Sequence, residues 1–205
     1  MEFKEILTNR RAINFFDPAQ NVTEDQLREI IQNAAKAPSS FNLQPWKLIV
    51  LRDASKKAEL QKLAFDQPKV SEAPVVLIML ADREGWKEGN TTLEANFSNS
   101  MQPEQRDWFI STTSALYGGS EAASQAFANK NTGLFAMSIM YAASDLGLHT
   151  HPMDGFDHEG VRKAFDIPEQ YWIPMLLCVG HKKKDVKIHP KGWRQSYEEM
   201  VLNTL

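Results

Sequence analysis

The chain has 205 residues, of which 42% are hydrophobic and 24% charged, with a formal net charge of −3. This composition is typical of a single globular domain, and so mild a charge argues against a nucleic-acid coat or a membrane-surface protein. The one cysteine, Cys178, excludes an internal disulfide, a Cys-x-x-Cys redox pair and a multi-cysteine metal or iron–sulfur site. We expect a cytoplasmic protein, because no secretory signal pattern opens the chain and its longest apolar run, residues 73–81, is too short to span a bilayer.

Helical and strand patterns alternate along the chain. A capping box at Thr23 to Gln26 precedes apolar residues at helical spacing, which predicts an amphipathic helix over residues 24–36. Residues 74–81 are β-branched and apolar on both faces, which predicts a central strand. Shorter patterns predict a strand at 47–52, a helix from 53 or 55 to 64, a buried helix from 120 to 146 and a strand at 173–179. The alternation indicates one α/β or α+β domain over residues 1–205.

Residues 86–119 differ from the rest of the chain. They are rich in Asn, Ser, Thr, Gln and Gly, with aromatic residues such as Trp86 and Trp108 scattered among them. A polar stretch of this length is typical of a mobile excursion on the surface, and its aromatic residues indicate that it covers something. We therefore expect a lid-like segment.

Several common chemistries fail at the level of single residues. Gly155 and Gly160 are spaced as in a phosphate loop but lack the Lys-Ser/Thr pair, and no Gly-x-Gly-x-x-Gly follows a strand. His158-Glu159 lacks the second histidine of a zinc protease. His149 and His151 would share a face of a strand, but we expect two partly exposed histidines rather than a metal site. Cys178 lies in a predicted core strand, where an inert thiol is expected.

Two basic clusters lie near the ends of the chain. Arg10 and Arg11 precede an apolar–polar alternation, and residues 182–194 carry five lysines and Arg194 against one acidic residue. Each cluster taken alone is typical of a solvated surface. The alternative is an anion site, since guanidinium groups grip phosphate with a fixed fork geometry.

The loop between the first predicted helix and strand is unusually rich in directional groups. Residues 37–46 hold two prolines, two serines, Asn42, Gln44 and Trp46. Such a loop is stiff and full of hydrogen-bond donors and acceptors, more than a simple connection requires. We therefore take it as a candidate functional element.

These elements occur together in an order that resembles the FMN-dependent nitroreductase family over nearly the whole chain. The matching motifs are Arg10-Arg-Ala-Ile-Asn14, Pro38-Ser-Ser-Phe-Asn-Leu-Gln-Pro-Trp46, Gln67-Pro-Lys69, Pro152-Met-Asp-Gly155 and Lys191-Gly-Trp-Arg194. The proline-flanked loop is the most specific of them. The stretch at 86–119 resembles the family least.

The resemblance implies an α+β fold, a three-layer sandwich whose central, mostly antiparallel sheet is flanked by helices in an intertwined homodimer. It implies FMN in the dimer interface, with the loop at Pro38 to Asn42 supplied by the other subunit. The positions that would contact FMN are Arg10, Arg11, Ala12, Asn14, Pro38, Ser39, Ser40, Asn42, Gln44, Gln67, Lys69, Pro152, Met153, Asp154, Gly155, Lys191 and Arg194.

The resemblance also implies roles in the reaction. Lys69 would supply positive charge at the pyrimidine side of the flavin, and the backbone N–H groups of Asp154 and Gly155 would point at flavin N5 and O4. Phe41, Trp108 and Phe127 would shape the stacking face for the acceptor. No metal is implied.

Two positions depart from the family pattern. Ala12 stands where a serine is usual, and Asn14 where a cation is usual. A hydroxyl contact to phosphate and a charge near the ring are therefore lost, which leaves Lys69 with more of the charge stabilisation and should lower the flavin's two-electron potential.

The implied function is NAD(P)H oxidation coupled to reduction of nitroaromatics, quinones or related acceptors, with ping-pong kinetics because one pocket serves both substrates. Other readings remain open: a dehalogenase, an ene-reductase or a flavin-cleaving enzyme on the same scaffold, or a flavin-binding protein without turnover. A small anion- or nucleic-acid-binding module using the basic tail is disfavoured by the slightly acidic composition.

Overall fold

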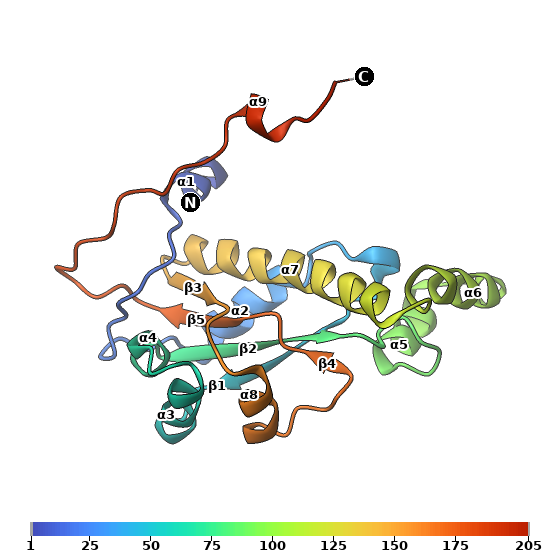
Figure 1. Cartoon of the computed structure of the whole chain (residues 1–205), viewed down its shortest axis with the longest axis horizontal. Helices are drawn as coiled ribbons and strands as arrows, with labels where there is room; N and C mark the ends of the chain where they lie inside the picture. The colour runs from blue at the N-terminus through green and yellow to red at the C-terminus, as the bar shows by residue number, and fades with distance from the viewer. Residues whose placement is uncertain (1, 205) are drawn as a thin grey trace.

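The centre of the molecule is an antiparallel sheet, described by a computed structural model that covers residues 2–204 (Figure 1). Its strands are β1 (Trp46–Leu51), β2 (Val75–Asp82), β3 (His149–Met153), β4 (Tyr171–Trp172) and β5 (Leu176–Gly180). The order is β1-β2-β5-β3, and β4 pairs with the last two residues of β2. All four ladders are antiparallel, which confirms the predicted sheet.

Helices cover both faces of this sheet. The longer ones are α2 (Glu24–Ala34), α3 (Ala54–Leu63), α5 (Thr91–Ser100), α6 (Arg106–Tyr117) and α7 (Glu121–Asp145). The shorter ones are α1 (Phe3–Asn9), α4 (Pro68–Glu72), α8 (His158–Ala164), α9 (Tyr197–Met200) and the 3-10 turns Ser40–Asn42 and Pro103–Gln105. Figure 1 shows α7 along one face of the sheet and α3, α4 and α8 on the other.

Strand β2 explains the layers, because all eight of its residues are buried. Its side chains alternate between two cores, as strand geometry requires. Val75, Leu77 and Met79 pack with α2 and α7, whereas the side chains between them pack with α3, α4 and α8. The predicted central strand is therefore confirmed, and with it the three-layer sandwich.

The structure corrects several sequence-based expectations. Strand β5 begins at Leu176 rather than at residue 173, because Pro174 has no N–H to donate to a ladder. Helix α7 was expected to be buried, but it is buried only in part, since Leu134 is 43% exposed. The helices α1, α4 and α8 were not predicted, because each spans at most two turns.

The stretch at 86–119 contains the two helices α5 and α6 and a hydrophobic cluster with the N-terminal part of α7. It thus forms a helical extension at one end of the sheet, as Figure 1 shows on the right. Period-3.6 patterning is weak in these helices, and polar side chains occupy several of their inner positions, such as Asn96 and Thr113. The sequence pattern therefore gave no signal for them.

The C-terminal residues form an arm that leaves the body of the molecule. From about residue 183 the chain runs past α1 and ends beyond α9 (Figure 1). Residues 189–200 are all exposed. None of the helices described over residues 2–204 has the length and apolar character needed to cross a bilayer.

Candidate functional site

Four predicted cations line one cavity, formed where the two ends of the chain meet. The cavity has a volume of about 470 Å³ and is lined by Leu7, Thr8, Arg10, Arg11, Ala12, Pro152, Lys191, Gly192 and Arg194. Within residues 2–204, none of its four cationic side chains forms an ion pair with a carboxylate. Four uncompensated positive charges around one cavity favour an anion such as a phosphate.

Arg11 joins the two ends of the chain. Its guanidinium donates to the carbonyl oxygens of His189 at 2.7 Å and Pro190 at 2.9 Å. These bonds place Lys191 next to the N-terminal segment, 180 residues away in sequence. Asn14 lies in a smaller neighbouring cavity, which Arg11, Lys182 and His189 also line.

Lys69 is the centre of a second cluster, built from α4 and β3. Its ammonium group donates to Gln67 Oε1 at 3.1 Å and lies 3.2 Å from His151 Nε2. Gln67 in turn donates to the carbonyl oxygens of Gly155 at 2.8 Å and Ala64 at 3.0 Å. Burial lowers the pKa of Lys69 below its ordinary value. Two of its three ammonium donors are engaged, which leaves one for a ligand.

The two clusters are neighbours. Ala12 and Pro152 line the cationic cavity, while Ile13 and His151, each adjacent in sequence, belong to the Lys69 cluster. The Ile13 N–H donates to the Thr150 carbonyl oxygen at 3.1 Å, which fixes the N-terminal segment along β3. An elongated ligand with its anionic end in the cavity would therefore reach Lys69.

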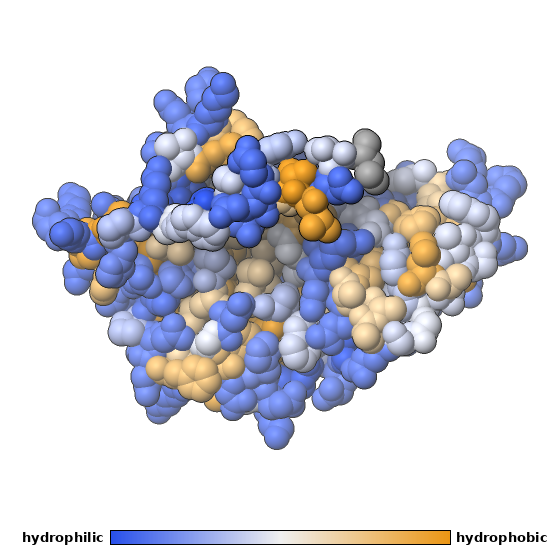
Figure 2. Space-filling model, turned by 45° about the horizontal axis from the view of Figure 1, so that its top comes forward, coloured by the Kyte–Doolittle hydropathy of each residue, from blue (hydrophilic) through white to orange (hydrophobic). Residues whose placement is uncertain are grey.

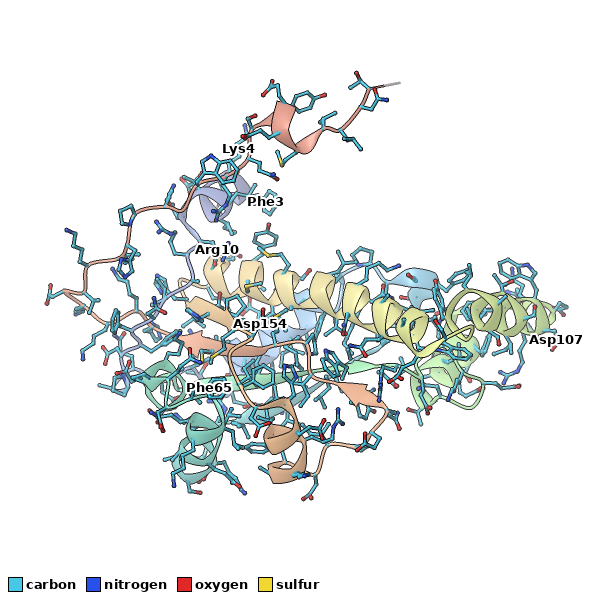
Figure 3. The ribbon with its side chains drawn as sticks, viewed as in Figure 1. Phe3, Lys4, Arg10, Phe65, Asp107 and Asp154 are labelled. Atoms are coloured by element: carbon cyan, nitrogen blue, oxygen red, sulfur yellow. The ribbon has the colours of Figure 1, made fainter. Side chains whose placement is uncertain are left out.

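The turn after β3 presents Asp154 and Gly155, both exposed. Over residues 2–204 their backbone N–H groups have no hydrogen-bond acceptor, so they are available to a ligand. In Figure 3, Arg10 follows α1 and Asp154 lies at this turn. The predicted contact residue Met153 is buried in the core, so its side chain is not available to a ligand.

The proline-flanked loop lies elsewhere and carries backbone strain. Phe41, Asn42 and Gln44 have φ values of 53°, 54° and 45°, in the left-handed region that non-glycine residues avoid. Such strain is found where the surrounding structure enforces it, commonly at functional sites. The loop is therefore a preformed surface rather than a flexible connection.

Buried amides enforce this loop, and sequence reasoning missed them. The side-chain oxygen of Asn131, in α7, accepts from the Ser40 N–H at 2.9 Å. Asn96, in α5, accepts from the Asn42 side chain at 3.0 Å and donates to the Phe41 carbonyl oxygen at 3.4 Å. The Ser39 hydroxyl accepts from the Gln44 N–H at 3.0 Å. Their only signal in the sequence is an Asn inside a helix that packs against the core.

The aromatic residues predicted for substrate contact gather beside this loop. The ring of Phe41 lies 6.4 Å from that of Trp108, which is 60% exposed. Phe127 is only 2% exposed, and its ring stacks on that of Tyr117 with the two centroids 4.3 Å apart. It therefore packs beneath the surface of this cluster and is not exposed to a ligand. Pro38 is exposed at the start of the loop.

Within one chain, the aromatic loop and the cationic cavity are far apart. Ser40 is bound to Asn131 near the middle of α7, whereas Arg10 and Arg11 lie beside Ser144 at its C-terminal end. Thirteen helical residues separate these points, about 20 Å. Figure 3 shows Asp107, the neighbour of Trp108, at the opposite end of the molecule from Arg10.

Comparison with known proteins gives a family match. The model of the nitroreductase family matches residues 7–181. The NADH dehydrogenase of Thermus thermophilus is 34% identical over 190 residues, which cover 90% of this chain and 89% of that protein.

Solved structures agree with this match. The nitroreductase family protein of Streptococcus pneumoniae has a TM-score of 0.84 and 29% identity, covering 99% of this chain and 100% of its own. A protein of Exiguobacterium sibiricum, solved in complex with FMN, has a TM-score of 0.85 and 25% identity, covering 98% and 97%.

Proposed function

The chain belongs to the nitroreductase family, and we propose that it is an FMN-dependent NAD(P)H oxidoreductase that reduces nitroaromatics, quinones or related acceptors. One observation carries the proposal: a cavity with four cations, none paired with a carboxylate among residues 2–204, lies beside Lys69 and beside two backbone N–H groups that have no acceptor in the same part of the chain. A flavin mononucleotide has a phosphate at one end and an electron-accepting ring at the other. The phosphate would fit the cationic cavity, and the ring would fit beside Lys69 and the two backbone N–H groups.

Different residues would contact different parts of the cofactor. The cationic cavity would hold the phosphate through Arg10, Arg11, Lys191 and Arg194, with Ala12 and Pro152 along the ribityl chain. Gln67 and Lys69 would face the pyrimidine side of the ring, and Asp154 and Gly155 would offer their N–H groups to its edge. Asn14, with no charge, would contribute only a polar contact.

When bound, FMN would supply the redox chemistry, which is two-electron transfer between NAD(P)H and the acceptor. The chain contributes orientation and charge. Lys69, whose ammonium group is held by Gln67, would supply positive charge at the side of the ring where negative charge develops. The fixed donors need no reorganisation during the reaction, which is why they lower its barrier.

We assign the missing half of the site to a second copy of the chain. The C-terminal arm exposes Trp193 at 73%, Tyr197 at 65%, Met200 at 63% and Leu202 fully. Figure 2 shows orange, hydrophobic side chains on this arm. Apolar residues on a segment that packs against so little of its own chain favour burial against a partner. In a homodimer the aromatic loop of one subunit would complete the cavity of the other.

This arrangement also suggests how acceptors bind. Phe41 and Trp108 would stack on a planar acceptor over the ring, and the α5–α6 segment would act as its lid. Because the hydride donor and the acceptor would use the same face in turn, the kinetics should be ping-pong.

A visible spectrum tests the proposal directly. The purified protein should bind FMN and turn yellow, and NADH or NADPH should bleach it without oxygen. Adding a quinone or nitroaromatic should restore the colour. A protein that binds FMN but is not bleached would be a flavin-binding protein without turnover, and a protein that binds none would contradict the proposal.

Lys69→Met tests the role of the charge. We expect slower anaerobic reduction by NADH, by roughly tenfold or more, with part of the FMN still bound. Lys62→Met, at an exposed position of α3, is the matched control and should reduce at the normal rate. Equal rates for Lys69→Met and the control would remove Lys69 from the mechanism.

Sedimentation of the full chain tests the dimer. We expect twice the chain mass of 23.3 kDa. Tyr197→Asp combined with Leu202→Asp should shift the protein toward monomer and release FMN, because burying either carboxylate is costly. A wild-type monomer that binds FMN tightly would contradict the shared site.

A further inference from the structure

His151 lies between Lys69 and the N-terminal segment, and the proposed function gives it no role beyond its place in the Lys69 cluster. It is the middle residue of β3 and is half-buried. Its Nδ1 lies 3.1 Å from the Ile13 carbonyl oxygen, and its Nε2 lies 3.2 Å from the Lys69 ammonium. The imidazole therefore bridges two segments that bound the proposed flavin site.

The two contacts determine where the ring proton lies. A carbonyl oxygen only accepts hydrogen bonds, so Nδ1 must carry the hydrogen that faces Ile13. An ammonium group only donates, so Nε2 must offer a lone pair to Lys69. Both conditions hold together only for a neutral imidazole in the Nδ1–H tautomer.

The reverse arrangement, an imidazolium beside a neutral amine, is disfavoured by the surroundings. Burial and, to a smaller extent, the charge of Lys69 lower the pKa of His151 to about 4, against the partial compensation of the bond to Ile13. The other titratable group across the β3–β5 ladder is the Cys178 thiol, whose pKa burial raises to about 12. This thiol is uncharged and cannot stabilise an imidazolium.

We propose that His151 is a positioning residue for Lys69: as the neutral Nδ1–H tautomer, it accepts a hydrogen bond from the Lys69 ammonium and ties it to the backbone of Ile13. The role in catalysis rests on the proposed function, whereas the contact itself does not. Lys69 then has both of its protein-bound donors fixed, one by Gln67 and one by His151, so that the third points in one direction.

The arrangement couples the charge to the phosphate cavity. Ile13 is flanked by Ala12, which lines the cavity, and by Asn14. The Ile13 carbonyl oxygen, which contacts Nδ1, belongs to the same fixed segment that borders the phosphate cavity. The cavity and the Lys69 ammonium are thereby held in one arrangement through the His151 ring.

Imidazole ¹⁵N chemical shifts of the full-length protein, with and without added FMN, test the contact. We expect His151 to show a protonated Nδ1 and an unprotonated Nε2 at pH 7. Assignment comes from the loss of these signals in His151→Gln. A protonated Nε2, or a doubly protonated ring, would overturn the proposal irrespective of FMN binding.

A double-mutant cycle with Lys69 tests the function. His151→Leu should slow anaerobic flavin reduction roughly fivefold, about 1 kcal/mol, the value of one hydrogen bond. In a Lys69→Met background the same change should have less than a twofold effect, because its target is gone. A further fivefold loss in that background would show that His151 acts independently of Lys69, and would overturn the proposal.

Two more variants separate positioning from packing. His151→Gln offers an oxygen near the place of Nε2 and should restore most of the rate, whereas His151→Asn reaches only Ile13 and should not. His149→Leu, on the same strand, is the control for packing and should leave the rate of flavin reduction unchanged. The Nδ1 atom of His149 is buried and has no hydrogen-bond partner among residues 2–204. Equal rates in His151→Gln and His151→Asn would overturn the proposal. If the wild-type protein shows the expected tautomer of His151 but binds no FMN, the proposed function is contradicted and the contact with Lys69 is not.

Discussion

Helix α7 carries two very different candidate half-sites, one near its middle and one at its C-terminal end. Near its middle, buried Asn131 holds the strained aromatic loop, with hydrogen bonds that are complete within one chain. At its C-terminal end, Arg10, Lys191 and Arg194 surround a cavity without carboxylate partners among residues 2–204.

The difference separates what the chain builds alone from what a ligand must complete. The loop stores strain that buried amides offset, so changes there should affect the stability of the protein. The cations repel one another and gain their energy only when an anion binds, so changes there should affect binding.

Arg10→Ala should have the largest effect, and the effect should be on binding. Loss of charge-assisted hydrogen bonds to a phosphate costs about 1.5–3 kcal/mol, which raises the Kd for FMN by roughly 10- to 100-fold. Fluorescence titration measures it, with Arg28→Ala, an exposed cation on α2, as control. The free energy of unfolding without FMN should change by less than about 0.5 kcal/mol. Tight retention of FMN would disprove the phosphate assignment.

Asn131→Leu should lower the stability of the protein, whereas Arg10→Ala should weaken binding. The side chain is fully buried, and its removal leaves the Ser40 N–H without an acceptor, which lowers the free energy of unfolding by about 2 kcal/mol. Urea unfolding of FMN-free protein measures this. Asn99→Leu, at an exposed position on α5, should cost far less. Equal stability of the two variants would show that the loop needs no such support.

Acid should weaken the fold through His151, with the smallest of the three effects. Its folded pKa of about 4 lies below the ordinary value of 6.5, so between these values the unfolded chain binds more protons. The free energy of unfolding should therefore fall by about 1 kcal/mol between pH 7 and pH 5.5, and should be unaffected by this group above pH 7. The difference in urea stability between wild type and His151→Gln isolates it from other groups, including His149, whose pKa burial also lowers. A pH-independent difference would contradict the buried neutral imidazole.

The sequence predicted the central strand β2 and its two neighbours β1 and β5, but not β3 or the short β4. The motifs named candidate site residues, and the structure brings four of the predicted cations to one cavity. The β2 pattern and the capping box at Thr23 are local signals, and both are present in the structure. The amides at Asn96 and Asn131 and the ring of His151 were not predictable, because their roles depend on partners 54 to 138 residues away. The family resemblance suggested roles for Lys69 and Arg10 and assigned the proline-flanked loop to the other subunit, but it could not show where along α7 the loop and the cavity lie.

The bonds from Arg11 to the His189 and Pro190 carbonyl oxygens close a loop of almost the entire chain. Contacts so distant in sequence bring a large loss of chain entropy before they bring any gain, so this corner should assemble after the sheet during folding. On the proposed function, a phosphate-bearing ligand in this cavity would stabilise the contacts between the two ends only after the sheet has formed. Its stabilising effect should rise with the logarithm of its concentration above Kd.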